Sequence, residues 1–174
     1  EERKKPVPLV NLFIDIGMPA ERVRELVHVG DLITLRRDFI ELAEGYVSGK
    51  AFDDRAGVVS LVGCLEALCQ VRHEWDVYAV ATSQEEVGLR GATTSAYGVN
   101  PDIAIAVDVT FGAQPGVSDD ETCTMGGGPV IARGPNIHPI MHEQLVSLAR
   151  EHELPHQIEA MGGATGTDAW AIQV

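Results

Sequence analysis

The sequence predicts an α/β protein with a parallel sheet in its larger part, residues 48–174, and three observations lead to this prediction. Two apolar runs, at residues 77–81 and 102–108, have the composition of strands that are buried on both faces. Helical patterns, at residues 57–70 and 139–152, lie before and after these runs. Alternation of helices with buried strands is typical of layered α/β folds.

Composition limits the functions that the chain can have. With 174 residues and 45% apolar residues, the chain is long enough to close one core. A formal net charge of −13 argues against binding of nucleic acid or anionic lipid by charge, and it suits a protein that binds cations. The three cysteines lack a CxxC spacing, which favours a reducing cytoplasm, and no apolar stretch reaches the ~20 residues of a membrane helix.

The first part of the chain has shorter patterns. We expect a strand over residues 8–16, a short helix over 19–29 and short β runs over 31–47. A domain boundary is predicted after residue 47, where the pattern changes to longer elements. The start Glu1-Glu2-Arg3-Lys4-Lys5 lacks the apolar core of a signal peptide, which favours an intracellular protein. The chain stops partway through an apolar helix and its start is equally uncapped, so we expect a fragment of a longer polypeptide.

An acidic turn follows directly after the first apolar run. Glu85 and Glu86 lie there, and the turn is closed by Gly88 and Gly91. In open α/β sheets the carboxyl ends of the strands are where ligands bind. For this pair alone, a solvated turn is the simpler interpretation, by roughly two to one, because charged residues are mostly exposed.

Two further acidic sites favour a functional site over a solvated turn. Asp53 and Asp54 precede a helix, where one aspartate can cap the free amides and the other is spare. Asp108 ends the second apolar run, where a charge needs a partner. Carboxylates gathered around one cleft repel each other unless cations lie between them, so we expect a divalent metal site, with zinc, cobalt or manganese as candidates.

The other candidate motifs are weaker. His138 and His142 have the i, i+4 spacing of a zinc-binding helix, but the glutamate of an HExxH motif is missing. The glycine-rich loop over residues 162–167 lacks the Gly-Lys-Ser/Thr of a phosphate-binding loop. We expect a close-approach loop at a helix start, with Thr167 and Asp168 as helix cap or substrate contacts.

Four segments together resemble a known family, and they span the chain in order: residues 49–57, 83–92, 106–110 and 166–169. They resemble the glutamyl or deblocking aminopeptidases, whose members often assemble as tetrahedral dodecamers and are sometimes labelled endoglucanases. The resemblance implies an α/β/α three-layer metallopeptidase domain of the phosphorylase/hydrolase-like type, interrupted by a β-barrel-like dimerisation insert. Residues 1–47 would be the end of that insert, and 48–174 a truncated catalytic domain.

The resemblance also implies a dinuclear metal-dependent aminopeptidase. By position, Asp53 would bridge the two metals, Glu86 and Asp108 would each bind one, and Glu85 would be the general base. The cofactors would be two divalent ions, zinc or cobalt, and the substrates would be peptides. The loop residues Gly166, Thr167 and Asp168 are predicted to contact the substrate, and the protein would form homo-oligomers, dimers that assemble into a dodecamer.

Two alternatives stay open. The family pattern needs two histidines, and neither position lies within these 174 residues, so each metal would lack its imidazole. A non-catalytic structural relative, or a fragment without a complete metal site, is therefore the second hypothesis. A glycosidase is the third, but retaining glycosidases need carboxyl groups ~5 Å apart on opposite sides of a sugar, which adjacent glutamates in one turn do not offer.

Overall fold

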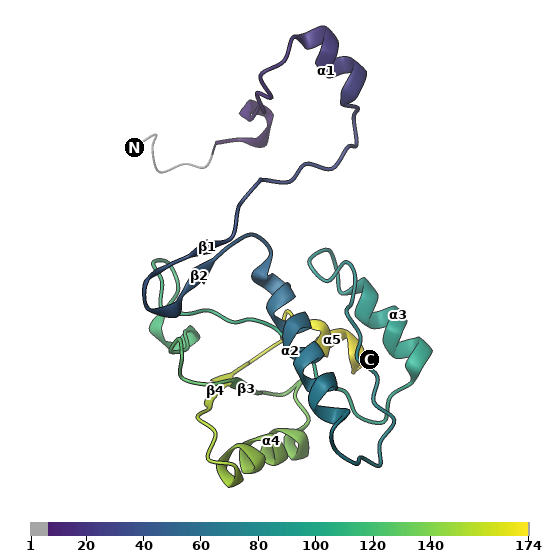
Figure 1. Ribbon diagram of the computed structural model, residues 1–174, viewed down its shortest axis with the longest axis vertical. Coiled ribbons are helices and arrows are strands. Elements are labelled where there is room, and N and C mark those ends of the chain that lie inside the picture. The colour runs from purple at the N-terminus through teal and green to yellow at the C-terminus, as the bar shows by residue number, and fades with distance from the viewer. Residues whose placement is uncertain (1–6, 174) are drawn as a thin grey trace. The chain divides into compact units, whose positions relative to one another are not determined.

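The computed structural model describes residues 7–173, and the chain divides into two compact units, Glu1–Asp38 and Phe39–Val174 (Figure 1). Two features of the sequence lie outside the described residues: the charged start at residues 1–5, and Val174, at which the last helix was expected to stop. The domain boundary after residue 47 stays a prediction.

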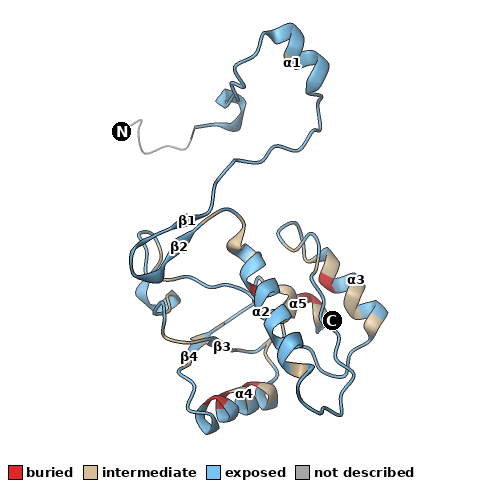
Figure 2. Cartoon of the chain, in the orientation of Figure 1, coloured by how far each residue is buried: buried red, intermediate tan, exposed pale blue. Residues whose placement is uncertain are grey.

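The first unit has little regular structure. It contains a 3-10 turn, η2 (Leu9–Asn11), and one helix, α1 (Ala20–Leu26), which confirms the short helix expected there. The strand predicted over residues 8–16 is wrong. Within the described residues this segment has no ladder partner, so Phe13 is 89% exposed and has no sheet to pack against (Figure 2).

The second unit begins with a small hairpin. Strands β1 (Ile40–Glu41) and β2 (Val47–Ser48) pair antiparallel around a 3-10 turn, η3 (Ala43–Gly45). Of the β runs predicted over residues 31–47, the described structure forms only this hairpin. Phe39 packs edge-on against the ring of Phe52, with ring centroids 6.2 Å apart, which holds the hairpin beside the next helix.

That helix, α2 (Phe52–Leu68), confirms the helix predicted over residues 57–70 but not its burial. Of its residues only Gly57 is buried, and Val59 is 70% exposed (Figure 2). The packed pairs of the second unit that include a helix are α3 with α5 and α4 with β3, so no layer of the described residues covers the apolar side chains of α2.

The two apolar runs do not form the buried strands that were predicted. Residues 76–82 and 102–108 have no ladder hydrogen bonds within the described part of the chain, and Tyr78 and Ile105 are 66% and 58% exposed. A strand is stabilised by a neighbouring strand rather than by its own sequence. Each sheet of the described residues has two strands, and none of them comes from these runs.

A pair of parallel strands follows the 3-10 turn η4 (Asp119–Glu121). Strands β3 (Val130–Arg133) and β4 (Gln157–Ala160) pair in parallel, and α4 (Pro139–Glu151) connects them and packs on β3 (Figure 1). The helix predicted over residues 139–152 is confirmed.

The buried face of α4 carries His142, Val146 and Ala149, whereas Leu148 is 50% exposed. The other part of the core lies where α3 (Arg90–Val99) packs on α5 (Asp168–Ile172). Ala92 of α3 and Ala171 of α5 are buried there, which brings the starts of both helices into one region.

Candidate active site

The acidic turn before α3 is closed by backbone hydrogen bonds, as predicted. The amides of Gly88 and Leu89 donate to the carbonyl of Glu85, at 3.1 and 2.9 Å, and the amide of Gly91 donates to the carbonyl of Ser83 at 2.9 Å. Gly91 approaches Ser83 so closely that an added Cβ would meet its backbone N and O atoms. The turn is therefore built by local geometry that only glycine fits at this position.

The two aspartates at the start of α2 have different surroundings. The peptide bond between Asp53 and Asp54 is cis, and the backbone angles of both residues are non-helical. The Asp54 Oδ1 atom accepts a hydrogen bond of 2.9 Å from the amide of Gly57, which is the capping role that the sequence predicts for one of the pair. Within the described residues no hydrogen bond occupies the Asp53 carboxylate, so it is the spare acid.

Charges from four segments meet at Glu85. Partial burial raises the pKa of its carboxyl group, and the carboxylates of Asp108, Glu86, Asp168 and Asp53 raise it further. Since charges act on one another over about 10 Å at ordinary salt, the segments that carry these carboxylates lie within that range of Glu85. The convergence of Asp53, Glu85 and Asp108 at one place agrees with the metal-site hypothesis.

Asp108 and Asp54 belong to the same cluster of carboxylates. Partial removal from water raises the pKa of Asp108, and the hydrogen bond of 2.8 Å from the amide of Val109 lowers it. The neighbouring carboxylates of Asp54, Asp53 and Asp168 raise this pKa further. Partial burial also raises the pKa of Asp54, against the lowering effect of its bond from the Gly57 amide. The site is thus a concentration of negative charge.

No basic side chain offsets this charge within the described residues. The Arg90 guanidinium, a possible partner for Glu85 or Glu86, instead contacts the Gln84 side chain, with Nη1 3.4 Å from Oε1. The ion pairs of residues 7–173 are confined to the first unit: Arg22–Glu25, His28–Asp31 and Arg36–Asp38.

Divalent cations suit this set of donors, because carboxylate oxygens are ligands for such ions and a cation relieves the repulsion between the acids. However, the described residues contain no group of three or more Asp, Glu, His or Cys side chains arranged to hold a metal ion. The kind of ligand fits a metal centre, and the number of ligands in residues 7–173 falls short of a complete one.

The glycine-rich loop before α5 reaches the same region. Thr167 caps α5, since its hydroxyl accepts a hydrogen bond of 3.3 Å from the amide of Ala169. The Asp168 Oδ2 atom accepts a hydrogen bond of 2.6 Å from the hydroxyl of Thr82, and its Oδ1 atom is buried without a partner among the described residues. Sequence reasoning missed Thr82, because a single threonine at the end of an apolar run gives no local signal.

Of the two histidines at α4, His142 has a structural role. His142 is buried, and its Nδ1 atom lies 2.9 Å from the carbonyl oxygen of Ala132 in β3. His138 is the residue that precedes the first turn of α4. The contact with β3 explains why a histidine lies on the inner face of this helix, and it agrees with the low weight given to a zinc-binding helix.

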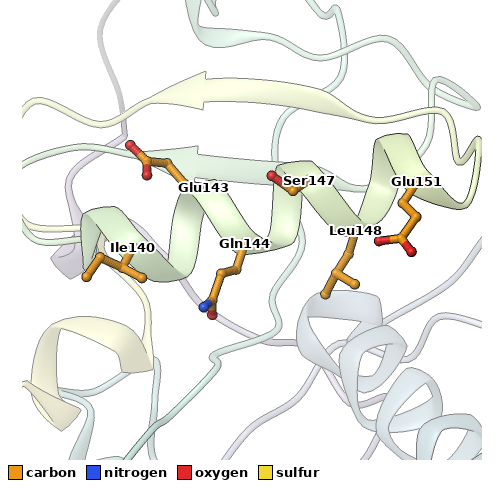
Figure 3. A pocket seen from close by; sticks show the side chains of 6 residues that line it. All are labelled: Ile140, Glu143, Gln144, Ser147, Leu148 and Glu151. Carbon is orange, nitrogen blue, oxygen red and sulfur yellow. The ribbon is translucent and has the colours of Figure 1, made fainter.

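A surface hollow on α4 lies on other residues. Figure 3 shows its lining side chains spaced along successive turns of this one helix: Ile140, Glu143, Gln144, Ser147, Leu148 and Glu151. None of the acidic residues of the cluster lines it. The candidate site is therefore defined by the convergence of carboxylates and not by this hollow.

Comparison with known proteins agrees with the family resemblance. A lysyl aminopeptidase of Pyrococcus furiosus is 34% identical over 167 residues, which cover 94% of this chain and 47% of that protein. A glutamyl aminopeptidase of Lactococcus lactis is 34% identical over 154 residues, or 83% of this chain and 41% of that protein. The chain spans about half the length of the curated relatives that it matches.

Solved structures give the same result and confirm the predicted α/β class. A TET aminopeptidase from a marine sediment thaumarchaeon superposes with a TM-score of 0.85 at 37% identity, over 98% of this chain and 50% of that one. The TET1 peptidase of Pyrococcus horikoshii, described as able to assemble into a tetrahedron or a large octahedral shell, superposes with a TM-score of 0.81 at 34% identity, over 98% of this chain and 51% of that one. The profile of the M42 glutamyl aminopeptidase family matches residues 1–174. The chain therefore belongs to the M42 glutamyl aminopeptidase family.

Proposed function

We propose that this chain carries part of a dinuclear metal-dependent aminopeptidase, which removes N-terminal residues from peptides. Family membership supports peptide hydrolysis. The observation that carries the finer proposal is the meeting of Asp53, Glu86 and Asp108 around Glu85, without a basic partner in the described residues.

The acids have separate roles in this proposal. Asp53 would bridge two divalent ions, zinc or cobalt, while Glu86 and Asp108 would each bind one of them. When bound, such ions polarise a substrate carbonyl and lower the pKa of a water molecule. The free Asp53 carboxylate fits a ligand, because Asp54 already supplies the cap of α2.

Glu85 would be the general base. It would take a proton from the attacking water and pass it to the leaving amine. Partial burial and neighbouring carboxylates raise the pKa of Glu85, which moves this carboxyl group toward the pH range in which a base works well. Adjacent side chains diverge from the backbone, so Glu86 can hold an ion while Glu85 faces the water.

The loop before α5 would contact the substrate through Gly166 and Thr167. Asp168, which the sequence also predicts as a substrate contact, is already bonded to Thr82. Gly166 has a φ of +71°, which suits a close approach of backbone to ligand. The whole protein would act on peptides in the cytoplasm as a homo-oligomer, with dimers assembling into a dodecamer. Among the described residues no helix is long and apolar enough to cross a membrane.

The substitution Glu85→Gln tests this proposal in the full-length protein. Glu85→Gln should lower kcat for a peptide substrate by roughly 10²–10⁴, the range for loss of a general base, with bound metal unchanged. Asp53→Asn should instead lose metal. Glu143→Gln, an exposed acid on α4 outside the cluster, is the matched control and should retain the parent's activity and metal.

Two results would contradict the assignment. Activity of Glu85→Gln within about tenfold of the parent would exclude Glu85 as the base. Absence of bound metal in the full-length parent would favour the second candidate function, a non-catalytic structural relative. That candidate is supported by the incomplete ligand set in residues 7–173.

A further inference from the structure

One hydrogen bond joins the start of α5 to the residue three positions before Glu85. The Thr82 Oγ1 atom donates to the Asp168 Oδ2 atom at 2.6 Å, across 86 residues of sequence, and both side chains are half-buried. An O–H donor at this distance from a carboxylate makes a short, charge-assisted bond, which is stronger than a bond between neutral groups.

The other oxygen of the same carboxylate distinguishes positioning from substrate binding. Asp168 Oδ1 is shielded from solvent and has no hydrogen-bond partner among residues 7–173. Oδ2 is already engaged by Thr82. A half-buried acid that repels Asp54, Glu85 and Asp108 lowers stability, so a role in the site is the better explanation for it.

The Thr82–Asp168 hydrogen bond is one of three contacts that connect the acidic turn to α5. Thr82 is followed by Ser83, whose carbonyl accepts the amide of Gly91 at 2.9 Å. Gly91 lies in the first turn of α3, and α3 packs on α5, which begins with Asp168. Both ends of the turn are therefore tied to α5, one through a side-chain bond and the other through helix packing.

We propose that Asp168 is a positioning residue, which fixes Glu85 by anchoring Thr82 to the start of α5. This inference rests on the proposed function, in which Glu85 is the base. General-base catalysis requires the carboxylate within hydrogen-bond reach of the water, so loosening one end of the turn reduces turnover more than substrate binding.

Amide hydrogen exchange of the full-length protein tests the anchoring directly. Thr82→Val keeps the side-chain shape and removes the donor, and it should speed exchange of the Gly88, Leu89 and Gly91 amides by roughly tenfold, as expected for loss of a bond to a charged group. Thr82→Ser keeps the donor and should exchange like the parent. Thr93→Val makes the same change at an exposed position of α3, where the hydroxyl donates to the Leu89 carbonyl, and is the control.

The acceptor gives an independent test. Asp168→Ala should speed the same amides as Thr82→Val, and the double variant should add little to either single change, because both remove one bond. Global unfolding measured on each variant separates loosening of the turn from loss of the fold. Equal exchange in Thr82→Val and Thr82→Ser, or full additivity in the double variant, would overturn the proposal.

Kinetics connect the anchor to the reaction. In an active parent, Thr82→Val should lower kcat by roughly tenfold with KM within about twofold and bound metal unchanged, and Thr82→Ser should restore kcat. An inactive parent would contradict the proposed function, while the exchange measurement would still decide whether Asp168 holds the turn. A rise in KM with kcat unchanged would instead assign Asp168 to substrate contact and overturn its positioning role.

Discussion

Alanine at Gly91 should damage the acidic turn, although alanine is the better helix former. An added Cβ would meet the backbone N and O of Ser83, and a backbone cannot rotate aside as a side chain can. Overpacking of this kind costs about 1–3 kcal/mol. The better helix propensity of alanine offsets about 0.5–1 kcal/mol of this, so we expect a net destabilisation of up to about 2.5 kcal/mol.

The matched control lies on the same helix. At Gly98 nothing lies within 4 Å of an added Cβ, so Gly98→Ala should stabilise the protein by up to about 1 kcal/mol through propensity alone. Denaturant unfolding of the full-length protein measures both effects, and kcat reports whether Glu85 has moved. If Gly91→Ala were as stable as Gly98→Ala and fully active, the close approach to Ser83 would not constrain the turn.

Two further predictions concern single side chains. His142→Ala should lower the free energy of unfolding by about 2–4 kcal/mol, because it empties a buried position and removes the contact with the Ala132 carbonyl, while metal analysis should find no change. The pKa of Asp54 is raised above its ordinary 3.8, so its favourable contribution to stability is present at pH below 3.8 and is lost as the pH rises through the raised pKa. In metal-free protein, Asp54→Asn should therefore be more stable than the parent at pH 7 and equal to it at pH 3, and equal stability at both values would contradict the repulsion.

Helices were predictable from the sequence, and strands were predictable only in part. The patterns at α2 and α4 predict helices, whose hydrogen bonds join residues four apart in the same segment, and both helices are present. The apolar runs at 77–81 and 102–108 specify only a preference for burial. Without a neighbouring strand among the described residues, that preference leaves side chains such as Tyr78 exposed.

The acidic cluster was predictable for a related reason. Asp53, Glu85 and Asp108 each follow or precede a strong local pattern, so their convergence was inferred from where helices start and apolar runs end. The contribution of Asp168 to the same cluster was not, because its partner Thr82 is 86 residues away and carries no motif. Long-range bonds between single side chains leave no periodic signal in a sequence.

This chain has two pairs of acids that are adjacent in sequence, Asp53–Asp54 and Glu85–Glu86, and each pair contributes both to the fold and to the candidate site. In the first pair, Asp54 caps a helix and stabilises it, whereas Asp53 makes no hydrogen bond within the described residues and adds only repulsion. In the second, the Glu85 carbonyl closes a turn while its carboxyl group lies among like charges. Fold stability explains Asp54 and the backbone of Glu85, but it gives no reason to gather the other carboxylates where the described chain supplies no basic partner. Their repulsion lowers stability, and a chain keeps such an arrangement where a cation or a reacting group offsets it.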